Sequence, residues 1–162
     1  MVSPTVPSTF GKYQPTIQTV LSVSPQDEDC VALERIFHKS DWTMYTKSKW
    51  TLIASLTLAS SFTVLQGRPI PIVLCECEML PGTWREMLKH ISLLPDPPLL
   101  IVTSRLADEH LWSEALNLGA YDVLTKPFDA TEVIRSVSLA WQHWQGRDEF
   151  RCQPNQPALF HA

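Results

Sequence analysis

The chain has 162 residues, 44% of them hydrophobic, which is enough to form one domain with a buried core. Its net charge of −4 offers no basic stripe, so we expect no nucleic-acid binding by the body of the protein. The start of the chain lacks a signal peptide, and the apolar run Leu52 to Leu65 is too short for a membrane span, which predicts a cytoplasmic protein.

Both ends of the chain differ in composition from its middle. Residues 1–16 are rich in proline, serine and threonine without any period, which predicts a flexible arm. The segment 146–162 is similar in character and is predicted to be a flexible tail. We therefore expect one folded domain over 17–145.

The first half of this domain begins with an apolar strand over Ile17 to Val23, followed by a helix from about Glu28 to Lys39. A short second strand is predicted at Trp42 to Thr46. The next apolar positions, from Leu52 to Leu65, indicate a helix.

A continuous apolar run over Pro71 to Cys75, which could extend to Cys77, is typical of a parallel strand covered on both faces. Apolar residues at three- and four-residue spacing predict a helix from Trp84 to Leu94. A strand at Leu99 to Val102 and a helix at Asp108 to Leu118 follow.

The last strand is predicted at Tyr121 to Leu124 and the last helix at Ala130 to about Gln145, with Asp129 as its N-cap and Glu132 three residues on. Five strands that alternate with five helices predict an α/β fold with a doubly wound five-stranded parallel sheet.

The segment Gly119 to Phe128 runs from a helix stop through a strand into Lys126-Pro127. An ammonium at the carboxyl end of a parallel strand points into the crevice where such sheets bind anions. About twenty residues upstream, the preceding strand ends at Thr103. This ordered set resembles the last two strands of a response-regulator receiver domain. The resemblance covers roughly 17–144 and implies the flavodoxin-like strand order 2-1-3-4-5.

The same resemblance implies an acidic pair after the first strand that holds Mg²⁺. Here Ser24 and Pro25 stand at those positions, and neither supplies a carboxylate, so we expect no cofactor and no Mg²⁺ binding. The nearby Asp27, Glu28 and Asp29 are either a displaced pair or the acidic first turn of a helix, which the helix dipole favours.

The phosphoacceptor of the resemblance lies at the end of the third strand. Strand length selects Glu76, whereas counting back from Pro81 selects Cys77, and Glu78 is a third alternative. We favour Glu76, because an acidic group beside Lys126 explains why a lysine is tolerated there.

Glu76 would accept a hydrogen bond from Thr103 and pair with Lys126. Without Mg²⁺, nothing neutralises a phosphate approaching this carboxylate, which predicts an atypical, phosphorylation-independent receiver. The alternative for the three residues is a salt bridge that only stabilises the fold. Cys75 and Cys77 could form half a metal site, but no second ligand pair accompanies them, so two packed thiols are expected.

In receiver domains an aromatic residue on the last strand takes part in switching; here Val123 stands at that position and Tyr121 lies two residues earlier. Trp112, Trp141 and Trp144, together with Tyr121, are candidates for an interface with a protein partner or a second copy in a homodimer. The alternative is that the tryptophans cover the edge of the core.

Three functions stay open from the sequence. The first is a pseudo-receiver that acts in two-component (phosphorelay) signalling through protein–protein contacts. The second is a working phosphoacceptor with unusual metal ligands near Asp27. The third is an enzyme, which the absence of a glycine-rich phosphate loop and of a nucleophile–base pair disfavours, so we expect no enzymatic activity.

Overall fold

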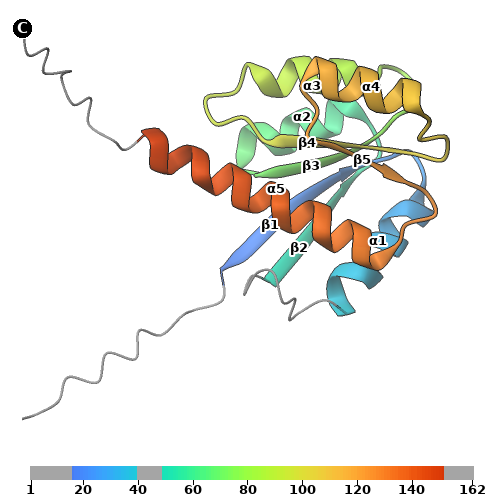
Figure 1. Ribbon diagram of the computed structural model, residues 1–162, viewed down its shortest axis with the longest axis horizontal. Helices are drawn as coiled ribbons and strands as arrows, with labels where there is room; N and C mark the ends of the chain where they lie inside the picture. Colours follow the sequence, from blue (N-terminus) through green and yellow to red (C-terminus); the bar gives the residue numbers. More distant parts are fainter. Residues whose placement is uncertain (1–15, 40–48, 152–162) are drawn as a thin grey trace, which may run out of the picture.

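The computed structural model describes residues 16–39 and 49–151, and within these ranges strands and helices alternate along the chain (Figure 1). The elements are β1 (Ile17–Val23), α1 (Asp27–Lys39), β2 (Lys49–Ser55), α2 (Leu58–Gly67), β3 (Ile72–Glu76), α3 (Trp84–Ser92), β4 (Leu99–Ser104), α4 (Glu109–Leu118), β5 (Asp122–Thr125) and α5 (Ala130–Arg151).

All strand pairs are parallel, and the sheet has the order β2-β1-β3-β4-β5. The predicted α/β class and the order 2-1-3-4-5 are therefore confirmed. Each parallel pair requires a crossover, and the helices supply these connections on both faces of the sheet.

Alternate residues of the strands enter two separate cores. On one face, α2, α3 and α4 pack against the sheet. Trp84, Met87 and Ile91 of α3 are among the largest fully buried side chains of this core. On the other face α1 and α5 pack Phe37 and Trp141 against the sheet. Figure 1 shows α5 lying across one face of the sheet while α3 and α4 lie beyond the other. Because β3 and β4 are covered on both sides, each begins with four consecutive apolar residues.

The helix predicted over Leu52 to Leu65 is wrong at its start, because a strand of the sheet occupies that part of the chain. The structure places β2 at Lys49–Ser55, where the sequence predicted the start of a helix, and Trp42 to Thr46 lies outside the described residues. β2 pairs in register with the whole of β1, from Ile17 opposite Lys49 to Val23 opposite Ser55. Its β-branched and aromatic residues fit a pleated surface, and pairing with β1 outweighs the helical spacing of the leucines.

The following helix begins at Leu58 because Thr57 caps it: the hydroxyl of Thr57 accepts a hydrogen bond from the backbone N–H of Ser60 at 3.1 Å. The last helix is longer than predicted. It continues to Arg151, so the tail predicted from Gly146 is helical at its start.

The remaining bounds agree with the prediction to within a few residues. The segments 1–15 and 152–162 of the predicted arm and tail lie outside the described residues. Among the residues that are described, none of the helices combines the length and the apolar character that a bilayer span needs.

Candidate functional site

The carboxyl ends of β1, β3, β4 and β5 meet at one edge of the sheet, and backbone hydrogen bonds continue past the strand ends. The N–H of Cys77 donates to the carbonyl of Thr103 at 2.8 Å, and the N–H of Lys126 donates to the carbonyl of Ser104 at 2.9 Å. These bonds hold the strand ends in register. The residues that follow each strand therefore face a common crevice, as in other parallel sheets.

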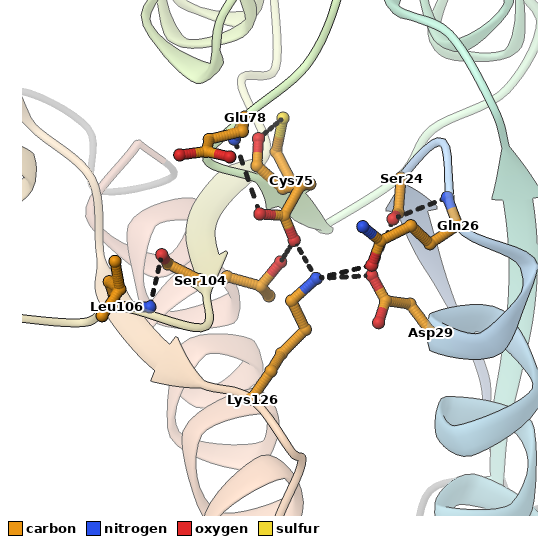
Figure 2. Close-up of polar contacts among 10 residues, drawn as sticks. Ser24, Gln26, Asp29, Cys75, Glu78, Ser104, Leu106 and Lys126 are labelled. Carbon is orange, nitrogen blue, oxygen red and sulfur yellow. Dashed lines mark hydrogen bonds and ion pairs between the residues drawn. The ribbon is translucent and has the colours of Figure 1, made fainter.

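Lys126 is the centre of this crevice. Its ammonium forms ion pairs with Glu76 at the end of β3 and with Asp29 in the first turn of α1, the latter at 2.7 Å. It also donates to the side-chain carbonyl of Gln26 at 3.4 Å. The Lys126 side chain is only 4% exposed. Figure 2 shows it reaching from the end of β5 to a point beside Asp29 and Gln26.

Glu76 is buried and accepts hydrogen bonds on both oxygens. The hydroxyl of Thr103 donates to Oε2 at 3.4 Å, and the backbone N–H of Glu78 donates to Oε1 at 3.5 Å. The structure thus brings Glu76, Thr103 and Lys126 together as predicted. Glu76 is the last residue of β3, whereas Cys77 and Glu78 follow the strand.

Asp29 is a site residue that the sequence did not single out from its acidic neighbours Asp27 and Glu28. Asp27, Glu28 and Asp29 do form the acidic first turn of α1, as the dipole argument expects, but Asp29 alone among them is buried. Its Oδ2 accepts a hydrogen bond from the hydroxyl of Ser24 at 2.7 Å and contacts Lys126. One signal could have found it: Asp29 precedes the buried Leu33 by four residues and so lies on the inner face of the helix.

The residues at the end of β1 do not fit the Mg²⁺ site that the receiver resemblance implies. The hydroxyl of Ser24 donates a hydrogen bond to Asp29. Pro25 is exposed, and its side chain has no atom that could bind a metal ion. The two nearby carboxylates, Asp29 and Glu76, are bridged by an ammonium. In the described ranges, no three His, Cys, Asp or Glu side chains gather in an arrangement that could hold a metal ion.

The space above this ion network is a crevice of about 240 Å³. Its lining combines the site carboxylate with charged, polar and apolar groups, namely Gln26, Glu76, Glu78, Ser104, Arg105, Leu106 and Lys126. Charges of both signs line it, so it presents no single strong field to an incoming phosphate.

Cys75 in β3 and Cys77 just after it are thiols with raised pKa values. Cys75 is fully buried, and its burial, helped by the nearby negative charge of Glu76, raises the pKa of its thiol to about 12. Burial likewise raises the pKa of the half-buried Cys77. Such thiols stay protonated and are poor nucleophiles and poor metal ligands.

The candidate interface residues differ in exposure. Trp141 is buried in the core under α5, which favours the core-edge alternative for that residue. Trp144 stacks on it with ring centroids 5.5 Å apart and donates its indole N–H to the carbonyl of Pro97 at 3.2 Å. Trp112 and Tyr121 are half-buried at the edges of the two cores.

The position that carries an aromatic switch residue in receivers is filled by Val123, which is buried opposite Val102 of β4. Tyr121 lies outside β5, and its ring contacts His143 of α5 with centroids 5.7 Å apart. No aromatic side chain of β5 therefore adjoins Thr103 in the described structure.

Comparison with solved structures identifies the fold. The chain superimposes on the signal receiver domain of a Luxo repressor protein from Vibrio parahaemolyticus with a TM-score of 0.72 and 15% sequence identity, covering 84% of this chain and 98% of that one. The receiver domain of an HD domain-containing protein from Pseudomonas fluorescens Pf-5 gives 0.69 and 20% identity, over 82% and 92% of the two chains. The beryllofluoride-activated NtrC4 receiver domain dimer gives 0.67 and 19%, over 78% and 98%.

No family model matches the sequence, and no curated protein matches it. The chain therefore has the fold of response-regulator receiver domains. Sequence identities of 15% to 20% support a shared fold and nothing more specific.

Proposed function

On this fold, we propose that the chain is a receiver-like module of two-component signal transduction that acts through protein contacts and needs no phosphorylation. The observation that carries the proposal is the end of β1, where Ser24 and Pro25 supply no carboxylate for Mg²⁺. Without that metal, a phosphate would meet the carboxylate of Glu76 with its negative charge uncompensated. The proposal is of a module without enzymatic activity or a bound cofactor.

Glu76 takes the place of the phosphoacceptor in this proposal. Its carboxylate is buried, paired with Lys126 and bonded to Thr103, so its oxygens are already engaged. A charge-assisted pair of this kind holds both side chains in one geometry. The arrangement keeps the strand ends near one conformational state.

The partner in this proposal is another protein of the signalling pathway or a second copy of the chain, in the cytoplasm. One of the similar structures is a receiver dimer, which supports self-association as a model. Trp112 and Tyr121 belong to the region of α4, β5 and α5, where exposed apolar side chains are added by Leu116, Leu118 and Leu139. Exposed apolar side chains on these elements suit a homodimer through them.

A working phosphoacceptor is the alternative. It is favoured by the presence of Thr103 and Lys126 around a carboxylate at the end of β3. In that case Mg²⁺ would have to bind with unusual ligands near Asp27, an exposed residue.

An amide NMR titration with Mg²⁺ and then beryllofluoride, a mimic of the phosphoryl group, tests the proposal. We expect no saturable shifts around Glu76, Thr103 and Lys126, because the carboxylate lacks a metal partner. The matched control is the triple variant Ser24→Asp, Pro25→Asp and Glu76→Asp, which should gain Mg²⁺-dependent shifts. Its first two changes supply carboxylates that the native chain lacks, and the third shortens the side chain of Glu76 by one methylene. Saturable shifts in the native chain would instead establish the working phosphoacceptor.

A further inference from the structure

Oxygen atoms from two parts of the fold converge on the ammonium of Lys126. Asp29 Oδ2 lies 2.7 Å from Nζ, Gln26 Oε1 lies at 3.4 Å, and Glu76 Oε2 is in direct contact. The first two come from α1 and the loop before it, and the third from β3. Both carboxylates are more than nine-tenths buried. One buried positive charge is therefore in contact with three side-chain oxygens.

Such a donor set suits a divalent cation as well as an ammonium. Carboxylate and amide oxygens are the ligands that Mg²⁺ and Mn²⁺ prefer, and two carboxylates that touch one atom can also bind one metal ion. Conversely, two buried carboxylates this close repel each other unless a cation lies between them. When both are ionised, Asp29 and Glu76 thus need a positive charge beside them, which an ammonium or a metal ion can supply; the other way to relieve the repulsion is protonation of one carboxylate.

We propose that Asp29, Glu76 and Gln26 form a cation site whose native occupant is the ammonium of Lys126, and that this built-in cation excludes divalent metal ions. The inference rests on the proposed function and deepens it. A built-in cation explains why the crevice needs no metal. Asp29, five residues after Ser24, then provides the carboxylate that is absent at position 24.

The tether of Lys126 gives it an advantage over a free ion. Its backbone is fixed by the hydrogen bond from its N–H to the carbonyl of Ser104, so the ammonium is delivered to the site at a high effective concentration. A divalent ion could enter only by displacing a side chain that is 4% exposed. It would then leave that ammonium buried without its partners.

The substitution Lys126→Met tests the site, because methionine is unbranched and uncharged and leaves both carboxylates in place. Calorimetry with Mn²⁺ should show binding at least about tenfold tighter than for the native chain, which corresponds to 1.4 kcal/mol. In NMR spectra, Mn²⁺ should broaden the amide signals of Asp29 and Glu76 in this variant but not in the native chain.

Two controls separate this site from general charge effects. The double variant Lys126→Met with Asp29→Asn should lose the gained affinity, because one carboxylate of the pair is gone. The variant Lys89→Met removes a positive charge from an exposed position on α3 and should bind Mn²⁺ like the native chain.

Because Lys126→Met leaves two buried carboxylates without a cation, its folding is followed by thermal unfolding with and without Mn²⁺, alongside Lys126→Gln. The expected result is a rise in Tm with Mn²⁺ for these variants and none for the native chain. Failure of both variants to bind Mn²⁺ or to be stabilised by it, including failure to fold in its presence, would overturn the inference. So would equally tight binding at this site in the native chain. Uptake of beryllofluoride by the native chain would be a failure of the proposed function, which the earlier titration detects separately.

Discussion

Lys126 shares its charge between Asp29 and Glu76, so the contribution of each contact depends on the other. Removing one partner of a buried pair destabilises a protein by roughly 3–5 kcal/mol, because a charge is left without compensation. When either Asp29 or Glu76 is replaced, Lys126 keeps the other carboxylate as a partner. The loss in the free energy of unfolding should therefore be at the lower end of that range. The hydroxyls of Ser24 and Thr103 add one hydrogen bond to each carboxylate. The five side chains of Ser24, Asp29, Glu76, Thr103 and Lys126 are thus linked to one another by hydrogen bonds and ion pairs.

The neighbouring Cys75 makes stability depend on pH. Its thiol has a pKa of about 12 in the folded protein against 9.0 for a solvent-exposed thiol, so folding favours the protonated form. Below pH 9 both states keep the proton and the full stability is present. Above pH 9 the unfolded chain loses the proton first, and stability falls by about 1.4 kcal/mol per pH unit as the pH rises toward the folded pKa.

Urea unfolding at pH 8 and at about pH 10.5 measures this loss. We expect the free energy of unfolding to fall by about 2 kcal/mol more for the native chain than for Cys75→Ala, whose cavity lowers stability equally at both pH values. Equal losses in the two proteins would contradict the burial argument. The less buried Cys30 offers a control, since Cys30→Ala should keep most of the native pH dependence.

At the scale of elements, local chemistry sets several boundaries. Asp108 caps α4 by accepting the N–H of Leu111 at 2.9 Å, and Gly119 ends that helix with φ at 109°. The N–H of Ala120 then donates to the carbonyl of Ala115 at 2.9 Å, which completes a Schellman motif. These residues could be recognised in the sequence, and the predicted end of α4 was confirmed.

The substitution Gly119→Ala tests this helix end. No atom lies within 4 Å of an added Cβ, so the expected loss of about 1 kcal/mol comes from the left-handed backbone alone. Gly67→Ala is the matched control, because Gly67 has equal space and no positive φ and lies within α2. That change should leave stability equal or raise it by about 0.5 kcal/mol. Urea midpoints give both values, and a similar change for the two variants would contradict the assignment.

The second strand shows where local chemistry is insufficient. Leu52 and Ile53 satisfy a helical pattern as well as a strand pattern, and the sequence alone chose the helix. The choice is made by β1, which offers a full row of backbone partners to Lys49–Ser55. A contact between segments separated by about thirty residues outweighs a local preference here.

At the scale of the whole molecule, one sheet joins two cores. Val73 and Cys75 of β3 enter the core under α2, α3 and α4, while Ile72 and Leu74 enter the core under α1 and α5. A strand cannot leave one core without leaving the other. We therefore expect both cores to be lost in a single cooperative transition.

Fluorine NMR of the chain labelled with 5-fluorotryptophan tests this expectation. Trp84 reports on the first core and Trp141 on the second, and both are buried. Their native signals should disappear with the same urea midpoint. Two separated midpoints would mean that the faces unfold independently, and single Trp→Phe variants assign the signals.

The sequence by itself determined the alternation of strands and helices, the strand order through its receiver resemblance, and the set of Glu76, Thr103 and Lys126. These depend on local patterns and on the rule that parallel strands end at one edge. Only the tertiary structure decided that Lys49–Ser55 is a strand and that Asp29 belongs to the site. Asp29 and Lys126 are 97 residues apart in the chain. Their side chains meet because α1 packs its inner face on the sheet. The spacing of Asp29 and Leu33 places Asp29 on the inner face of α1, but only the packing of α1 on the sheet brings it to Lys126.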